Sequence, residues 1–438
     1  MKALLIALAF AVQAPTDTLP DFSHPWTLAQ CTSWAMEHNL TVAQQANSVE
    51  GREIDRNTAH MSWLPGVSAS ASENFSFGRG LGGDNTYESG NSSSTGFSIG
   101  ANMNLFDGGA TYNQIRLSDL NLEAALADLE KAKDDIRVQV AQAYVQILYN
   151  YEIRDVARQQ IAIDSLQVER LERMFESGRS SAAEVSQQKA SLAQSRVTLV
   201  QADNNVRASL LDLAQLLEFS YWEGFSIVRP NVSMEGVFLG TPDDIYAQAL
   251  GIRPAIRAEE LRLKGTERSI AIAKSNYFPS LSISGGSGTN YYSNYGGKAF
   301  FDQLKSNFSS YVGLSLSIPI FTKFNTRNQV RSAKLNQVNQ EIALRRVKQN
   351  LYKEIQQAWN AAEAAHAKWE ASQIASAAAE DSFTLVQAKY ENGKATVTEF
   401  NESRSRLVKA QSDAAQAVCE YLFQSRLVEF YRGVPLQM

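Results

Sequence analysis

Two very long segments without glycine or proline constrain this chain more than any other feature. They run from Ala110 to Ser177 and from Asn325 to Asn392. Glycine and proline are the residues that most disfavour a helix interior, so each segment can form one unbroken helix. At 1.5 Å per residue, such a helix would be roughly 100 Å long. Globular domains rarely contain helices of this length, so we predict a mostly α-helical chain built on two exceptional helices.

Apolar residues recur along the first segment with heptad spacing. Ile136, Val140 and Ile147 belong to this pattern, and Lys133 interrupts it. Such a pattern is typical of helices packed in a coiled coil. The second segment is rich in alanine between positions 358 and 379, which favours close helix packing. We therefore expect both long helices to pack against other helices.

The two segments belong to a tandem repeat with an offset of about 215 residues. Each copy has a helical stretch (28–62 and 243–276), a proline, two strand-like runs, the long helix, a glycine and a shorter return helix. The loop between the strand-like runs is longer and more aromatic in the second copy, from position 285 to 310. We predict repeat 1 at residues 15–218, an inter-repeat equatorial segment at 219–242, repeat 2 at 243–432 and a tail at 433–438. The matched landmarks are Trp63-Leu64-Pro65 with Tyr277-Phe278-Pro279, Leu105-Phe106 with Ile320-Phe321, and Glu176-Ser177-Gly178-Arg179 with Glu391-Asn392-Gly393-Lys394.

The strand-like runs alternate between apolar and small polar residues, as in Val312, Leu314 and Leu316 with glycine and serine between them. This pattern fits an ordinary sheet with one face on a core, or transmembrane strands. The long flanking helices and the aromatic residues near the strand ends favour the membrane. Four strands cannot close a barrel, and open edges are not tolerated in lipid, so several copies must pool their strands. The candidate membrane-interface aromatics are Trp63, Phe106, Tyr277, Phe278 and Phe321.

The first residues predict export. Lys2, the apolar run from Ala3 to Val12 and a small residue at position 14 are typical of a secretory signal peptide, predicted at residues 1–14. No later stretch approaches the roughly 20 apolar residues of a membrane-spanning helix. The net charge is −5, without the basic excess that nucleic-acid binding requires. We therefore expect an exported protein that does not bind nucleic acid.

Residues that carry chemistry are sparse. The two cysteines, Cys31 and Cys419, are placed by helix lengths at heights that differ by about 10–15 Å, whereas a disulfide needs Cα atoms within about 7 Å. The histidines are scattered, without metal-ligand spacing. The sequence Gly78-x-Gly80-x-x-Gly83 leads into a loop, whereas a dinucleotide-binding motif leads into a helix. We predict unpaired cysteines, no catalysis, no cofactor and no metal.

With this organisation the sequence resembles the TolC family of outer-membrane efflux and secretion channels, also called outer-membrane factors. The resemblance covers nearly the whole mature chain, and it includes the motifs from Gly178 to Val185 and from Gly393 to Phe400. It implies a mostly α fold with a small β part, in which tandem long helical hairpins form a periplasmic α-barrel. Four strands per protomer would contribute to a transmembrane β-barrel shared by a homotrimer.

The function implied by the resemblance is a passive exit duct in the outer membrane. Its partners would be outer-membrane lipid, a periplasmic adaptor protein and the inner-membrane transporter of a tripartite efflux or type I secretion system. From the residues alone, a periplasmic coiled-coil scaffold protein remains the alternative, since a scaffold would share the heptads without needing the alternating strands.

The resemblance also places the tunnel entrance at the glycine turns, Gly178 and Gly393. Glu184, Glu399 and Glu402 match acidic positions that narrow and select the entrance. Glu184 and Glu399 also complete capping boxes with Ser181 and Thr396, which is a structural role. Glu402 has Gln187 as its counterpart in repeat 1, and it is the preferred selectivity residue, because a ring of acids favours cations. A plain solvated surface charge is the competing interpretation.

Tyr390 matches a family tyrosine that helps to hold the tip closed. The arginine that completes this lock is replaced by Ala395, so the lock must be weaker here or built differently. Arg179 and Lys394 lie in the turns themselves. They would contact an adaptor, or act as favourable cations at the C-terminal end of a long helix.

Overall fold

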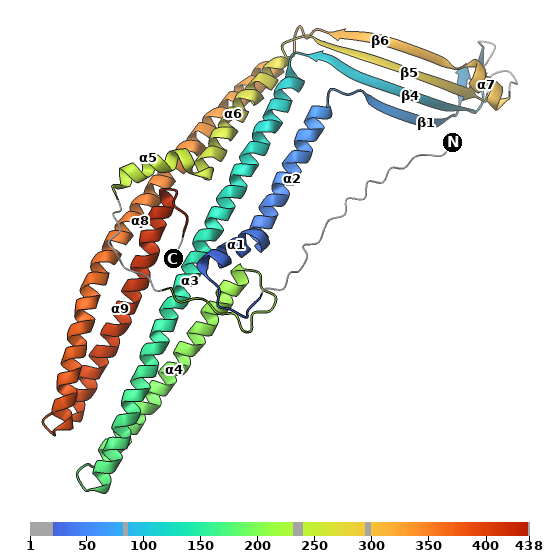
Figure 1. Cartoon of the computed structure of the whole chain (residues 1–438). Coiled ribbons are helices and arrows are strands. Elements are labelled where there is room, and N and C mark those ends of the chain that lie inside the picture. The colour runs from blue at the N-terminus through green and yellow to red at the C-terminus, as the bar shows by residue number, and fades with distance from the viewer. Residues whose placement is uncertain (1–20, 82–85, 231–239, 294–298, 437–438) are drawn as a thin grey trace. The chain divides into compact units, whose positions relative to one another are not determined.

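The computed structural model describes residues 21–81, 86–230, 240–293 and 299–436 (Figure 1). The predicted signal peptide, residues 1–14, lies outside this range. The chain groups into two units. Unit 1 combines residues 21–43, 133–249 and 354–436, and unit 2 combines 44–132 and 250–353, in each case within the described residues. The predicted fold class is confirmed, because the described residues form long helices and a small antiparallel β part.

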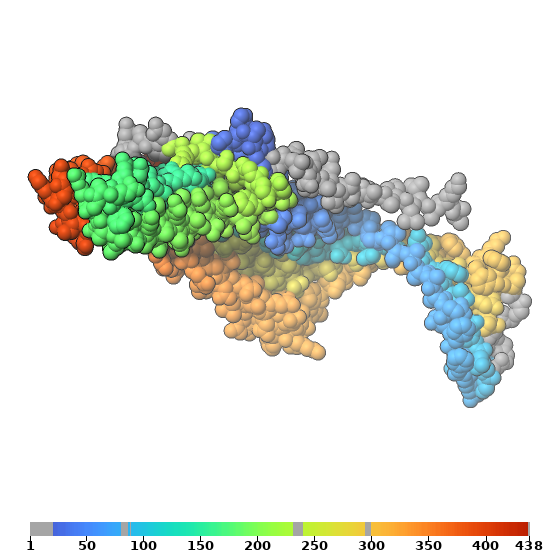
Figure 2. Space-filling view, turned by 90° about the horizontal axis from the view of Figure 1, so that it is seen from below, coloured from blue at the N-terminus to red at the C-terminus, as the bar shows by residue number. Residues whose placement is uncertain are grey.

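The long helices have nearly the predicted bounds. Helix α3 runs from Ala110 to Glu176 and α8 from Asn325 to Glu391. The return helices are α4, Ala182–Leu216, and α9, Val397–Tyr431. In the space-filling view, α3 and α4 (green) form one continuous surface (Figure 2). The heptad positions Ile136, Val140 and Ile147 are buried, which confirms the packing that the heptads predict for this part of α3.

Each long helix ends in the same Schellman turn, with a glycine at positive φ (+73° for Gly178 and +69° for Gly393). The two residues after the last turn donate backwards and satisfy carbonyls that the helix end leaves free. The glycine is required because a Cβ in this conformation would crowd the following carbonyl. The bonds are Gly178 N to Phe175 O at 2.9 Å, Arg179 N to Met174 O at 2.8 Å, Gly393 N to Tyr390 O at 3.1 Å and Lys394 N to Lys389 O at 2.8 Å.

Two stretches that we predicted as single helices are each broken. The first divides at Asn39 into α1 (Leu28–His38) and α2 (Leu40–Met61). Asn39 has extended backbone, and its Nδ2 donates to Leu216 O at 3.0 Å, so the side chain stabilises the break. The second divides at Arg253 into α5 (Pro242–Ile252) and α6 (Pro254–Ser275). Arg253 is extended because the residue before a proline disfavours the helical conformation.

Aromatic packing in unit 1 joins the N-terminal segment to the start of the inter-repeat segment. The Trp26 ring lies 5.3 Å from Phe219 and 6.1 Å from Phe225, between ring centroids. Trp26 N also donates to Ser226 O at 2.8 Å. The tilted and edge-on rings are the arrangements that aromatic quadrupoles favour. These contacts tie together residues about 200 positions apart in the chain.

The strands of both repeats form one four-stranded antiparallel sheet in unit 2, with the order β1-β4-β5-β6. The strands are β1 (Gly66–Ser76), β4 (Ser92–Asp107), β5 (Ser280–Tyr292) and β6 (Ser309–Ser317). A separate small hairpin pairs β2 (Arg79–Leu81) with β3 (Tyr87–Ser89). We predicted a loop over residues 285–310, and the bounds of that prediction are wrong. β5 continues through Tyr292, and helix α7, Phe300–Ser306, follows before β6.

The strand register keeps the two predicted faces separate across the whole sheet. On one face, here called the apolar face, Val67 pairs with Ala101, Ala101 with Gly285 and Gly285 with Val312. On the opposite face, here called the serine face, Ser70 pairs with Ser98, and their hydroxyl oxygens are 2.7 Å apart. From Gly66 to the bulge after Asn104, and in β5 and β6, every ladder residue of the serine face is serine, glycine, asparagine or tyrosine. The sheet therefore has one mainly apolar face, interrupted by Glu73 and by hydroxyl residues such as Ser287, and one face that is neutral and polar up to the bulge.

Both cysteines are free and buried, as predicted. Burial raises the pKa of Cys31 to about 12 and that of Cys419 to about 12. A thiol with such a pKa is hardly ionised at neutral pH, and the thiolate is the reactive form. Both residues therefore serve as small apolar side chains in unit 1.

The turn geometry predicts opposite effects for two glycine-to-alanine changes. Gly178→Ala should destabilise the protein by about 1–2 kcal/mol, because alanine is strained at positive φ. Gly51→Ala, inside exposed α2 with no atom within 4 Å of the added Cβ, should stabilise it by about 0.5–1 kcal/mol. Thermal unfolding followed by circular dichroism measures both changes. Equal shifts of the two melting temperatures would contradict the turn assignment.

Candidate functional site

The tips of the two helical hairpins begin their return helices with matching capping boxes. Ser181 N donates to Glu184 Oε2 at 3.0 Å, and Glu184 N donates to Ser181 Oγ at 3.2 Å. At the second tip, Thr396 N donates to Glu399 Oε2 at 2.7 Å and Glu399 N to Thr396 Oγ1 at 3.2 Å. The capping role of both glutamates is therefore confirmed. It satisfies backbone donors that a helix start leaves free.

Hydrogen bonding favours the ionised form of both capping glutamates. The hydroxyl of Ser180, followed by the backbone of Ser181, lowers the pKa of Glu184. The backbone N–H of Thr396 is the main cause of the lowered pKa of Glu399. Both carboxylates also lie near the positive end of a helix dipole. The capping bonds of both glutamates engage one carboxylate oxygen, Oε2.

The remaining predicted tip residues are exposed. Glu402 accepts a hydrogen bond from Arg406 at 2.5 Å, and their side chains are 59% and 74% exposed. Exposed pairs of this kind contribute little to stability, and the Glu402 carboxylate is open to solvent. Arg179 and Lys394 are also exposed at the turns. The predicted roles of these three residues stay predictions.

Tyr390 belongs to an apolar cluster at the second tip. Its ring stacks on Phe400, with centroids 4.9 Å apart and an interplanar angle of 27°. Phe400, Phe383 and Leu407 form the buried part of this cluster, and Ile163 of α3 packs against it. Partial burial raises the pKa of Tyr390. The tyrosine thus lies where α3 of the first hairpin meets the second hairpin.

Arg170, which the sequence analysis did not identify, links the two tips. It lies on α3, and its Nη2 donates to Glu391 O at 2.6 Å while its Nη1 lies 3.6 Å from Glu391 Oε1. Its guanidinium carbon is 5.7 Å from the centre of the Tyr390 ring, within cation–π range. A guanidinium from the first hairpin therefore joins the hairpins, where the second hairpin has Ala395. The predicted role of Tyr390 in holding the tip closed stays a prediction.

A second missed residue, Asp164 on α3, is fully buried. Its carboxylate accepts hydrogen bonds from Gln188 Nε2 at 3.2 Å and Ser195 Oγ at 2.5 Å, both on α4. Gln160 Nε2 donates to it at 3.1 Å within α3, and Arg404 of α9 forms an ion pair with it. Burial lowers the pKa of Arg404. The heptad register reaches this position, since Asp164 lies 28 residues after Ile136, but an acid there departs from the apolar pattern.

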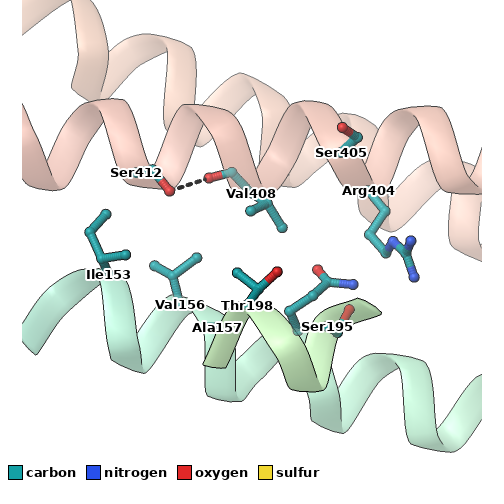
Figure 3. Close-up of a pocket in the computed structure, with 10 residues that line it drawn as sticks. Ile153, Val156, Ala157, Ser195, Thr198, Arg404, Ser405, Val408 and Ser412 are labelled. Carbon is teal, nitrogen blue, oxygen red and sulfur yellow. Dashed lines mark hydrogen bonds between the residues drawn. The ribbon is translucent and has the colours of Figure 1, made fainter. Parts of the chain in front are cut away.

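A cavity of about 220 Å³ lies beside this ion pair, between α3, α4 and α9 (Figure 3). Ile153, Val156 and Val408 form apolar parts of its wall, and Ser195 and Arg404 form polar parts. The close-up shows the Arg404 side chain reaching from its helix toward the first hairpin (Figure 3). The return helix of the second hairpin is therefore not packed uniformly on the first.

The predicted membrane-interface aromatics lie where the helices of unit 2 meet the strands. Trp63 lies between α2 and β1, and Phe106 lies next to the end of β4. Tyr277 and Phe278 lie between α6 and β5, and Phe321 between β6 and α8. All five side chains are exposed, by 41% to 71%. The structure thus brings them to the strand ends, and their contact with a membrane stays a prediction.

Chemistry-bearing groups are not gathered elsewhere in the described part of the chain. Within it, no group of three or more histidine, cysteine or acidic residues is placed to hold a metal. Among its helices, none combines the length and the apolar character that crossing a membrane requires. After Gly78 and Gly80 the chain enters strand β3 at Tyr87, and Gly83 lies outside the described residues. The glycines therefore do not lead into the helix that nucleotide binding needs.

The sequence profile of the family described as outer membrane efflux protein matches residues 32–217 and 245–426. Fusaric acid resistance protein FusA of Burkholderia cepacia is 27% identical over 214 residues, covering 48% of this chain and 39% of that protein. The chain thus spans about two fifths of FusA. Outer membrane efflux protein BepC of Brucella suis biovar 1 is 23% identical over 322 residues, covering 73% of this chain and 68% of that protein.

Solved structures share the fold over nearly the whole chain. The outer membrane protein VceC from Vibrio cholerae aligns with a TM-score of 0.77 and 19% identity, covering 94% of this chain and 97% of that chain. The Campylobacter jejuni outer membrane channel CmeC aligns with a TM-score of 0.79 and 18% identity, covering 94% and 87%. At these identities the alignments show a common fold.

Charge on the capping glutamates should make the first tip sensitive to pH. Because the folded pKa of Glu184 is lowered, its ionised form adds stability above the ordinary value of 4.5, and this is lost as pH falls through the folded pKa. Glu184→Gln keeps a neutral capping box, so its melting temperature should approach that of the wild type as pH drops from 7 to 3. Glu184→Ala, which removes the box, should melt lower than Glu184→Gln throughout. A pH-independent difference between wild type and Glu184→Gln would contradict this assignment.

Proposed function

Because the chain belongs to the outer membrane efflux protein family and is thus an outer membrane protein, we propose that it is the passive exit channel of an efflux system, assembled as a homotrimer. Three copies would supply twelve strands to one barrel and six hairpins to one periplasmic tunnel. A periplasmic adaptor and an inner-membrane transporter would be its partners, and the transporter would supply the energy. The two proposed repeats, residues 15–218 and 243–432, would alternate around the tunnel.

The observation that carries this proposal is the unfinished sheet. The outer strands β1 and β6 each have one unpaired edge, and the apolar face is uncovered, with Val312, Leu314 and Leu316 exposed by 81%, 68% and 62%. Lipid would cover such a face, but it would not satisfy the backbone groups of the edges. Pairing β1 of one copy with β6 of the next removes both edges. Self-association is therefore the simplest way to pair both edges of the sheet.

The helical part of unit 2 also supports self-association. Leu335, Val338 and Ile342 lie on α8 and are exposed by 66%, 49% and 49%. Their spacing of three and four residues places them on one side of the helix. Contiguous apolar stripes on an isolated subunit usually mark an interface. We assign this stripe to contacts between protomers.

The serine face would line the barrel. Up to the bulge after Asn104 its ladder residues carry hydroxyls, amides or no side chain, so this part of the barrel would not select ions by charge. Beyond the bulge, Asp107 pairs with Ser280 and adds an acid to this face. Selection would then fall to the entrance acids, with Glu402 as the preferred residue and Glu399 and Glu184 engaged in capping. The exposed Arg179 and Lys394 would face the adaptor. The name of FusA refers to fusaric acid resistance, which is consistent with export of small molecules by a relative.

Oligomeric state and conduction test the proposal directly. The full-length protein, extracted from outer membranes with detergent, should have the mass of three chains and should conduct ions in planar bilayers. A protein recovered without detergent as a monomer from the periplasmic fraction would refute it. That result would favour the alternative of a periplasmic scaffold.

Neighbouring residues of β6 provide a matched test of the two faces. Leu314→Arg places a charge on the apolar face and should cost about 2–4 kcal/mol near the membrane centre. Ser315→Arg places the same charge on the serine face, where water would solvate it. We expect the first variant to lose outer-membrane trimers and the second to assemble, measured by quantifying trimers in membrane fractions. A scaffold protein would tolerate both changes equally.

Ion selectivity tests the role of Glu402. Glu402→Gln should reduce the cation preference in reversal-potential measurements, because three acids disappear from the entrance of a trimer. Arg406→Gln frees the same carboxylate from its partner and should raise the preference. Glu184→Gln is the comparison and should reduce the cation preference less, since Oε2 of that carboxylate is engaged in its capping box. If Glu402→Gln and Arg406→Gln left the reversal potential unchanged, Glu402 would be an ordinary surface charge.

A further inference from the structure

The first hairpin has a polar interior that the tandem repeat does not reproduce. Gln160, Asp164 and Gln167 follow one another at helical spacing on α3, and all three are buried. Gln188 and Ser195 are buried opposite them on α4. At the equivalent positions, about 215 residues later, the second hairpin has no acid or glutamine. These equivalents are Ala375, Ala379, Ser382, Ser403 and Ala410.

Arg404 of the second hairpin enters this polar interior. Its side chain is only 13% exposed, and it pairs with Asp164, which is 0% exposed. The other donors to Asp164, namely Gln160, Gln188 and Ser195, all belong to the first hairpin. Arg404 is therefore the one described partner of this carboxylate that comes from the other hairpin.

Burial makes this contact all-or-none. For an ion pair in water, the free energy changes little when the pair forms or breaks. A buried carboxylate that loses its cation stays uncompensated in a medium of low dielectric, so partial separation is unfavourable. The pair is consequently either seated, or fully withdrawn with water replacing the guanidinium. The cavity of about 220 Å³ beside Arg404 leaves room for that exchange.

Lys189 occupies the position in the first hairpin that is equivalent to Arg404 in the second. Lys189 Nζ lies 2.7 Å from Glu172 Oε1, with the two side chains 56% and 44% exposed. This pair joins α3 to α4 within one hairpin and is open to solvent. The duplication therefore supplies one buried cation that links two hairpins and one exposed cation that does not.

The Asp164–Arg404 ion pair, here called the seat, lies away from the turns. Asp164 is about four helical turns before Gly178, and Arg404 is about three turns after Gly393. Ile163, next to Asp164 in the sequence, packs on the Phe400 cluster, and Arg170 contacts Glu391 nearer the turns. The Arg170 contact is partly exposed, at 28% and 46%, so it is the weaker of the two charged links. A movement that parts the tips must strain the buried seat before α9 can leave α3.

We propose that Arg404, seated on Asp164, is the positioning residue that holds the second hairpin against the first and so keeps the channel entrance closed. This inference rests on the proposed channel function. Withdrawal of Arg404 frees α9, and the tips then part together with the weaker Arg170 contact. Neither Asp164 nor Arg404 touches the transported molecule.

The test uses the full-length trimer in planar bilayers. Single variants leave a buried group unpaired and can misfold, so the decisive protein is the double variant Asp164→Asn/Arg404→Gln, which removes both charges. We expect its open probability to rise roughly tenfold, within the range of coupling between two-state elements. The single variant Arg404→Lys keeps the positive charge, so its open probability should stay close to that of the wild type. Lys189→Gln is the matched control and should behave as the wild type does.

A second readout separates this inference from the channel proposal. Amide hydrogen exchange across residues 397–410 should speed up about tenfold in the double variant and stay unchanged in Lys189→Gln, whether or not the protein conducts. A wild type that never conducts would refute the channel proposal, and the exchange data would still decide whether Arg404 holds the hairpin. Wild-type exchange and open probability in a well-folded double variant would overturn the inference.

Discussion

The unpaired edges of the four-stranded sheet are the constraint on which the rest of the structure depends. A sheet with a bare apolar face needs lipid, but lipid cannot satisfy the hydrogen-bonding groups of β1 and β6. Closure by further copies answers both needs at once. The helices are subject to the same requirement, because the exposed stripe at Leu335, Val338 and Ile342 is also left unfinished by a single chain. Strands and helices therefore both require further copies of the chain. The strands would contact them by backbone hydrogen bonds and the helices by apolar side chains.

Much of the fold could be predicted from the sequence because its determinants are local. The bounds of α3 and α8 follow from the absence of glycine and proline, and their ends follow from Gly178 and Gly393 at positions that need positive φ. The capping boxes could be predicted for the same reason, since each is completed within four residues. The break at Arg253 was also predictable from the proline that follows it. The break at Asn39 was not, because it depends on Leu216, far away in the chain.

The parts of the candidate site that the sequence did not reveal depend on contacts between hairpins. Asp164 and Arg404 are 240 positions apart. Asp164 lies 28 residues, or four heptads, after Ile136, so the heptad register places it on the packed side of α3. The sequence does not show which residue compensates its charge, because Arg404 belongs to the other hairpin. Arg170 was missed because the resemblance pointed to position 395 of the second hairpin, which holds alanine, whereas Arg170 belongs to the first hairpin. Patterns within one element predict that element, whereas partners between elements require the fold.

Divergence between the repeats is therefore more informative than their similarity. Where the copies agree, as at the glycine turns and the capping boxes, the shared residues satisfy backbone groups that any helical hairpin must satisfy. Where they differ, one copy carries a group whose partner lies in the other, as with Asp164 opposite Arg404 and Arg170 opposite Glu391. Two identical hairpins would have to make each such link in both directions or not at all. Unequal hairpins form it once, so that each protomer has a single interface that can be held or released as a unit.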